Sequence, residues 1–293
     1  MTSLRRCRPL MGTLAEVELD ADLAAAALAE LSQQIYAELQ RLDAKYSFHR
    51  VDSVLSAINR CAIRAATVEL DNETAGLLGA ALRFSKCSDG LFDICMAPQL
   101  IRLGALPHRI DLPDSPGDWR DLYLDDTRMS FARPLLLDLG GIGKGYAVDR
   151  ALGLVPDGVD ATVNIGGDLR MRHWQNQSIA LRGPQGRMCA VVRMRAAAVA
   201  TSIGAVGDHL GVLIDPRDGR PSTDPRSYSV FADDTLHADA LTKLAILTDD
   251  LDLLWRAGAR AVVRVDAKGQ IATWTALQSG DPTAVGEAAP PCR

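Results

Sequence analysis

Segments with the two-residue period of a strand alternate irregularly with segments of helical period along this chain of 293 residues. Apolar and polar residues alternate from Thr13 to Leu19, which predicts a strand. Apolar residues then recur every three or four positions from Leu28 to Leu42, which predicts a long helix with Asp20 or Asp22 as its N-cap. No repeat and no clear linker interrupts this order, so one α+β domain is favoured over two independent ones.

The rest of the chain continues the irregular pattern. Residues 75–84 predict a helix that ends before Ser88-Asp89-Gly90, where the glycine can form a left-handed turn. Residues 101–137 are rich in Pro, Asp and Arg and predict loops and short strands. Further strands are expected at 161–165, 190–200 and 211–215, helices at 149–154 and 238–247, and a hairpin of 261–265 with 271–274.

The charge and the apolar content exclude several classes of protein. The chain has 32 Lys and Arg against 37 Asp and Glu, a net charge of −5, so no general attraction to nucleic acid or to anionic lipid is expected. No apolar run reaches the length of a membrane span. From the charge we expect no nucleic-acid partner, and from the charge and the short apolar runs we expect no membrane partner.

Cysteine usage and the N-terminus both favour the cytoplasm. Six cysteines are scattered without metal spacing, which is typical of reduced thiols in a reducing compartment. Arginines lie near the start, but no apolar segment of a signal peptide follows them. We therefore predict a cytoplasmic protein.

The densest glycine cluster is the segment Asp138–Asp149, which reads DLGGIGKGYAVD. An apolar run enters it and a helix is expected to leave it, so its backbone N–H groups and Lys144 could approach phosphate oxygens. The spacing is neither that of a Walker A loop nor that of the dinucleotide-binding GxGxxG motif. Pattern alone leaves both a structural loop and an anion-binding loop open.

Three further clusters are weaker when each is taken alone. Asn164–Asp168 and Ile214–Pro221 read as turns, and His237–Lys243 reads as the start of a helix, where Asp239 can simply favour the helix dipole.

Taken in order, these segments resemble one family. Its motifs correspond here to Arg8–Thr13, Asp52–Asn59, Gly90–Ile94, Asp138–Asp149, Asn164–Asp168, Thr201-Ser202, Asp215–Pro221 and Ala238–Leu241. The order and the glycine-rich segment are similar to the ApbE family of FAD:protein FMN transferases, over about residues 8–247. The resemblance implies a single ApbE-like domain over residues 1–285, with mixed or antiparallel sheets flanked by helices, and a loose tail over 286–293.

The resemblance also implies an activity. Family members cleave FAD with Mg²⁺, release AMP and attach FMN to a Thr or Ser of an acceptor flavoprotein. FAD, Mg²⁺ and such an acceptor are therefore the expected cofactors and partners. A magnesium ion at a diphosphate would clamp oxygens and neutralise developing charge.

The site residues that the resemblance implies fall into two groups. The flavin- and adenosine-binding positions are Met11, His49, Leu91, Phe92, Asp93, Asp138 and Lys144. The metal would be held by the carbonyl of Gly141, by the carboxylate of Asp239 and at the position of Lys243. The catalytic residue stays unknown, with His209 as a weak candidate.

The sequence departs from the family pattern at five of its functional positions. His49 replaces a tyrosine, Cys95 a threonine, Ile203 a glycine, Val212 a histidine and Lys243 a metal-ligating threonine. Because an ammonium has three donors and no acceptor, Lys243 cannot ligate a metal. Lying one helical turn after Asp239, it is instead predicted to form a salt bridge with that carboxylate. Two alternatives therefore stay open: an FAD-binding carrier or partner of the same fold without transferase activity, and a relative with another ligand.

Overall fold

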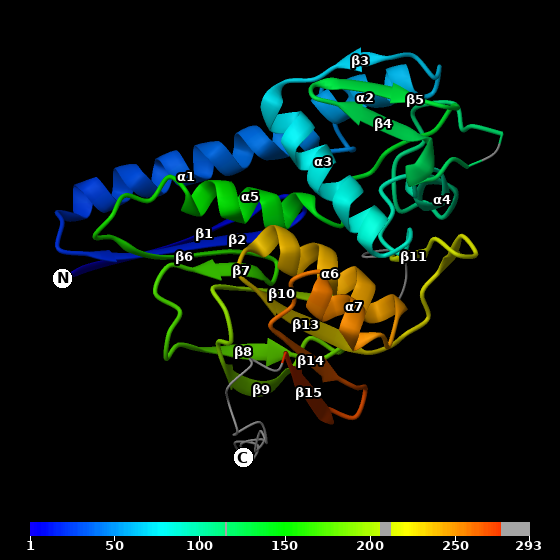
Figure 1. Ribbon diagram of the computed structural model, residues 1–293. Helices are drawn as coiled ribbons and strands as arrows, with labels where there is room; N and C mark the ends of the chain where they lie inside the picture. Colours follow the sequence, from blue (N-terminus) through cyan, green and yellow to red (C-terminus); the bar gives the residue numbers. More distant parts are fainter. Residues whose placement is uncertain (115, 206–211, 277–293) are drawn as a thin grey trace. The chain divides into compact units, whose positions relative to one another are not determined.

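The computed structural model describes residues 1–114, 116–205 and 212–276, in two compact units (Figure 1). Among the described residues, unit 1 consists of 1–40, 144–204 and 223–276, and unit 2 of 41–114, 116–143, 205 and 212–222. The single domain expected over residues 1–285 stays a prediction, and the expected tail over 286–293 lies outside the described residues.

Unit 1 is built on an eight-stranded sheet with the order β1-β2-β6-β7-β10-β13-β14-β15, and all of its strand pairs are antiparallel. The strands are β1 (Thr2–Leu10), β2 (Thr13–Ala21), β6 (Asp160–Ile165), β7 (Asp168–Met171), β10 (Ala198–Ile203), β13 (Ser227–Ala232), β14 (Ala261–Val265) and β15 (Ile271–Thr275). The α+β class with antiparallel sheets is thereby confirmed, as is the hairpin of β14 and β15.

Helix α1 (Ala25–Tyr46) lies on the first two strands through its buried apolar stripe. The hydroxyl of Tyr36 donates to the carbonyls of Arg6 and Ala15, each at 3.0 Å, which ties the helix to β1 and β2. The N-cap prediction is wrong: Asp20 belongs to β2, where it pairs with Ser3, and the helix begins only at Ala25, beyond the reach of Asp22 as its cap.

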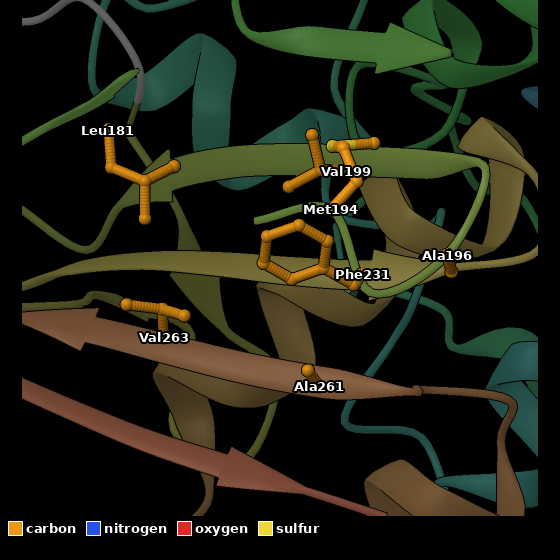
Figure 2. Packing of buried hydrophobic residues seen from close by; sticks show 7 residues of the cluster. All are labelled: Leu181, Met194, Ala196, Val199, Phe231, Ala261 and Val263. Carbon is orange, nitrogen blue, oxygen red and sulfur yellow. The ribbon is translucent and has the colours of Figure 1, made fainter. Parts of the chain in front are cut away.

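Helix α6 (Thr235–Leu247) packs against β7, β10 and β13 in unit 1. A hairpin of β8 (Ser178–Arg182) and β9 (Met188–Arg193) adds apolar side chains to the cluster on these strands, including Leu181 (Figure 2). The cluster contains Leu181, Met194, Ala196, Val199, Phe231, Ala261 and Val263. Because successive residues of a strand point to opposite faces, cover on both faces explains why every residue of β13 is buried.

Two other helices complete unit 1. Helix α7 (Leu251–Arg256) follows α6 and packs against it. Helix α5 (Gly143–Leu152) begins six residues before the helix predicted from 149, so part of the expected glycine-rich loop, Lys144 included, is helical.

Unit 2 holds helices α2 (Val54–Ala62), α3 (Asn72–Cys87) and α4 (Ala97–Arg102). A small antiparallel sheet has the order β3-β5-β4 and consists of β3 (Val68–Glu69), β4 (Leu122–Asp125) and β5 (Arg128–Phe131), with the 3-10 turn η1 (Trp119–Asp121) before β4. The pair β11 (Ile214–Asp215) and β12 (Arg220–Pro221) forms a separate hairpin. The predicted end of α3 before Gly90 is confirmed, and α4 is an element that the sequence reading missed.

Among the described residues, no helix combines the length and the apolar character that crossing a bilayer requires.

Candidate active site

Four charged side chains meet in unit 1, and we call them the ion cluster: Lys144, Asp168, Asp239 and Lys243. Lys144 comes from the first turn of α5, Asp168 begins β7, and the other two lie one turn apart on α6. Lys144 Nζ lies 2.6 Å from Asp168 Oδ2 and 4.0 Å from Asp239 Oδ2. Lys243 Nζ donates to Asp239 Oδ1, which confirms the predicted salt bridge.

The two carboxylates of the ion cluster are buried, whereas the side chain of Lys144 is partly exposed. The side chains of Asp168 and Asp239 are 2% and 0% exposed, against 32% for Lys144. Burial opposes charge on all three groups. The lysines nevertheless hold the pKa of Asp239 below its usual value, and the two carboxylates raise that of Lys144. Burial and the charge of Asp239 raise the pKa of Asp168. Of these three side chains, that of Lys144 is the most exposed and is therefore the best placed to contact a ligand.

The first turn of α6 is fixed by two aspartates. Asp149 on α5 accepts the backbone N–H groups of Thr235 and Leu236 at 2.9 and 2.8 Å, and it also accepts from Arg170 at 2.8 Å. The N-cap Asp234 accepts the N–H of His237 at 2.8 Å. These bonds satisfy donors that a helix start leaves unpaired, and they set the position of α6 relative to α5.

Gly145 lets α5 approach α6 closely. A Cβ at this position would lie 2.3 Å from the carbonyl oxygen of Thr235 and 2.8 Å from Asp239 Cβ. Its N–H donates to Asp239 Oδ2 at 3.0 Å. Only glycine fits here, and the close approach brings Lys144 to the carboxylates.

The turn before Asp168 also requires a glycine. Gly166 has φ +62°, and a Cβ there would lie 2.8 Å from the side chain of Thr13. The N–H of Gly167 donates to Asn164 Oδ1 at 3.0 Å. Three of the sequence motifs, those of Thr13, Asp168 and Lys144, therefore support one site in unit 1.

In unit 2, Asn59 holds the segment that leads into Asp138, which has no regular secondary structure. Its side-chain amide donates to the carbonyl of Leu137 at 2.9 Å, and the N–H of Leu137 donates back to its oxygen at 2.8 Å. Asp138 accepts the N–H of Gly140 at 3.0 Å. Burial raises the pKa of Asp138, with the Gly140 bond acting in the opposite direction.

Asp93 is the second carboxyl of interest in unit 2. It accepts the backbone N–H groups of Cys95 and Trp119 at 2.8 and 3.1 Å. Burial raises its pKa to about 6, although these bonds oppose the shift. Nearby, the indole Nε1 of Trp119 is buried without a hydrogen-bond partner and lies 2.7 Å from where a Cβ of Gly90 would be.

The other implied site residues lie as follows. Met11 occupies the β1–β2 turn with φ +51°, and His49 is exposed, with its carbonyl accepting from Arg109. Leu91 is half-buried, whereas Phe92 is buried against Phe84 with ring centroids 5.7 Å apart. Gly141 is half-buried in unit 2, and His209 lies outside the described residues. The flavin- and metal-binding roles of these positions stay predictions.

The sequence reading missed two members of the site in unit 1. Asp168 was part of a quoted motif but received no role, and Ser202 accepts from Lys243 Nζ at 3.2 Å. An aspartate directly after a Gly-Gly turn was the available signal for Asp168. Ser202 belongs to the Thr201-Ser202 motif, but nothing near it in the sequence predicts its contact with Lys243, which lies 41 residues away.

The ion cluster does not fit Mg²⁺ in the way that the resemblance implies. Magnesium takes oxygen ligands, whereas position 243 supplies an ammonium that already contacts Asp239. Among the residues that the structure describes, no group of three or more His, Cys, Asp and Glu side chains is placed to hold a metal.

The pH dependence of stability should report the burial of Asp93. A carboxyl whose folded pKa is about 6 rather than 3.8 binds protons more tightly in the folded state, so folding loses stability as the pH rises from about 4 to about 6. The difference corresponds to up to about 3 kcal/mol. Chemical unfolding at pH 4–7 measures the free energy of unfolding of the wild type and of Asp93→Asn. Relative to the variant, the wild type should lose stability as the pH rises through this window. Parallel curves would contradict the assignment.

Comparisons with known proteins identify the family and the fold of this chain. The model of the ApbE family matches residues 11–271. The FAD:protein FMN transferase of Treponema pallidum (strain Nichols) is 28% identical, covering 80% of this chain and 76% of that protein. The enzyme of the same name from Haemophilus influenzae (strain ATCC 51907 / DSM 11121 / KW20 / Rd) is 26% identical, covering 82% and 79%. The crystal structure of the ApbE protein of Thermotoga maritima shares the fold, with a TM-score of 0.78, 24% identity and coverage of 92% and 96%. Since the family model spans most of the sequence, the chain belongs to the ApbE family.

Proposed function

We propose that this protein is an FAD:protein FMN transferase. Membership of the ApbE family and the two relatives of that name support the activity. The observation that carries it in this structure is Lys144 in the first turn of α5, whose side chain is partly exposed and whose ammonium pairs with the buried carboxylate of Asp168. Helix N-terminal N–H groups and a lysine together suit the oxygens of a diphosphate such as that of FAD.

The reaction balances as a phosphoryl-group transfer. A hydroxyl oxygen of a Thr or Ser on the acceptor flavoprotein forms a bond to the phosphorus of the FMN half. The bond from that phosphorus to the bridging oxygen breaks, and AMP leaves with that oxygen. The hydroxyl proton is released. In this reaction Lys144 would hold the diphosphate and offset charge on the leaving phosphate.

We propose no step through Mg²⁺, because the ammonium of Lys243 lies at Asp239 where an oxygen ligand of the ion would be needed. It retains FAD as substrate, an acceptor protein as partner and the cytoplasm as compartment. The residues implied at the flavin, namely Met11, His49, Leu91, Phe92, Asp93, Asp138 and Lys144, belong to the proposal as ligand-binding positions.

Ligand selectivity tests the role of the diphosphate. We expect FAD and ADP to bind more tightly than FMN and riboflavin, because only the first two carry the diphosphate that Lys144 would recognise. Titrations of the full chain with each compound, followed by calorimetry, measure this order. Equal affinity for FAD and riboflavin would show that the diphosphate is not recognised.

A further inference from the structure

Lys243 is held more tightly than Lys144. Its Nζ donates to Asp239 Oδ1, to Ser202 Oγ at 3.2 Å and to Thr242 Oγ1 at 3.1 Å, and its side chain is 14% exposed. An ammonium has three N–H donors, so all three have an acceptor within unit 1. Thr242 is itself held by the carbonyl of Asp239 at 2.7 Å and by the hydroxyl of Ser202 at 2.8 Å. Lys243 is thus built into the site.

Both carboxylate oxygens of Asp239 already accept a hydrogen bond. Oδ1 accepts from Lys243, and Oδ2 accepts the N–H of Gly145 at 3.0 Å while lying 4.0 Å from Lys144 Nζ. The side chain is fully buried, so it is not exposed to bulk solvent. A metal ion that bound this carboxylate would have to compete with the ammonium and with the backbone N–H for its oxygens.

The charges of the ion cluster also disfavour the binding of a metal ion at Asp239. With both carboxyl groups ionised, Asp168 and Asp239 are balanced by Lys144 and Lys243, and the formal charge is zero. A divalent ion would have to enter beside two fixed positive charges, and like charges repel strongly at a partly buried site. Removing the charge of Lys243 alone would leave a net charge of −1, which attracts a cation.

We infer that Lys243 is a built-in cation that takes the place of a divalent metal ion at Asp239. The exclusion of metal follows from unit 1 alone. A second part rests on the proposed function: FAD binds here without metal, with Lys144 as the ammonium that reaches the diphosphate.

The first experiment uses Mn²⁺ alone as the probe, counted as free ion by electron paramagnetic resonance during titration of the full chain. The wild type should bind no Mn²⁺ at Asp239, whereas Lys243→Thr should gain one site with an affinity at least about tenfold higher than any wild-type binding. Lys268→Thr, an exposed lysine on the β14–β15 turn, is the matched control and should behave as the wild type.

Each outcome decides the inference. Stoichiometric Mn²⁺ binding by the wild type that is lost in Asp239→Asn would overturn it, and this result needs no variant of Lys243 to fold. A gain in Lys243→Thr that disappears in Lys243→Thr/Asp239→Asn supports it. A folded Lys243→Thr protein that gains no Mn²⁺ site would show that the ammonium is not what excludes the metal.

The second experiment separates this inference from the proposed function. FAD is titrated into the wild type in EDTA and in excess Mg²⁺, and we expect the two affinities to agree. FAD binding that needs Mg²⁺ would overturn the metal-free site. A wild type that binds FAD in neither buffer would refute the proposed function and metal-free FAD binding with it, while the Mn²⁺ titration still decides whether Lys243 replaces a metal.

Discussion

Replacing Lys144 with Met should lower the free energy of unfolding by about 3 kcal/mol, because it leaves buried Asp168 without its partner at 2.6 Å. The value lies at the low end for a broken buried pair, since Lys144 is 32% exposed. The same change should weaken FAD binding by about 1.5–3 kcal/mol, the contribution of a lost charged hydrogen bond. Urea unfolding and FAD titration measure the two effects, with Lys268→Met as the exposed control.

A double variant separates the structural role of Lys144 from its ligand role. Lys144→Met/Asp168→Asn removes the unpaired carboxylate, so it should regain most of the lost stability. It should not regain FAD affinity, because the ammonium is still missing. Unchanged FAD affinity in Lys144→Met would contradict the assignment of Lys144 to the diphosphate.

Gly145→Ala should destabilise the protein by about 3 kcal/mol, because the added Cβ would lie 2.3 Å from the carbonyl oxygen of Thr235 and must push α5 away from α6. The shift would also lengthen the Gly145–Asp239 hydrogen bond of 3.0 Å and disturb the ion cluster. We therefore expect FAD affinity to fall together with stability. Thermal and urea unfolding measure the first effect, and calorimetry the second.

The matched control is Gly76→Ala in α3, where an added Cβ meets nothing within 4 Å. Since alanine is the better helix former, this change should stabilise the protein by about 0.5–1 kcal/mol. A Gly→Ala substitution is thus expected to lower the stability of the protein in α5 and to raise it in α3. A neutral Gly145→Ala would refute the close packing of α5 on α6.

Periodic apolar patterns predicted the elements whose faces are buried continuously. The strand at Thr13 and the helix from Leu28 to Leu42 are examples, because the apolar residues along one face of each are buried. The edge strand β1 was missed because its residues are alternately half-buried and exposed, with arginines among them. The start of α5 was missed because glycines disfavour helices, and the presence of Gly145 is explained only by its close contact with α6.

At the site, a contact between residues close in the sequence could be predicted, whereas a contact between distant residues could not. The Asp239–Lys243 salt bridge follows from a spacing of four residues on one helix, and the structure contains it. The Lys144–Asp168 pair joins residues 24 positions apart and depends on the turn at Gly166-Gly167 and on the packing of α5. Such a pair is set by the fold, so the sequence alone could not predict that Lys144 contacts Asp168.

The release of AMP from FAD tests the proposed transferase activity most directly. The full chain is incubated with FAD, in EDTA and in Mg²⁺, and the nucleotides are separated by chromatography, with Lys144→Met as the control. We predict that the wild type releases AMP and that the FMN half appears either free, with water as acceptor, or attached to protein, while Lys144→Met releases far less. FAD that stays bound and intact in both buffers would contradict the account and identify the protein as an FAD-binding carrier.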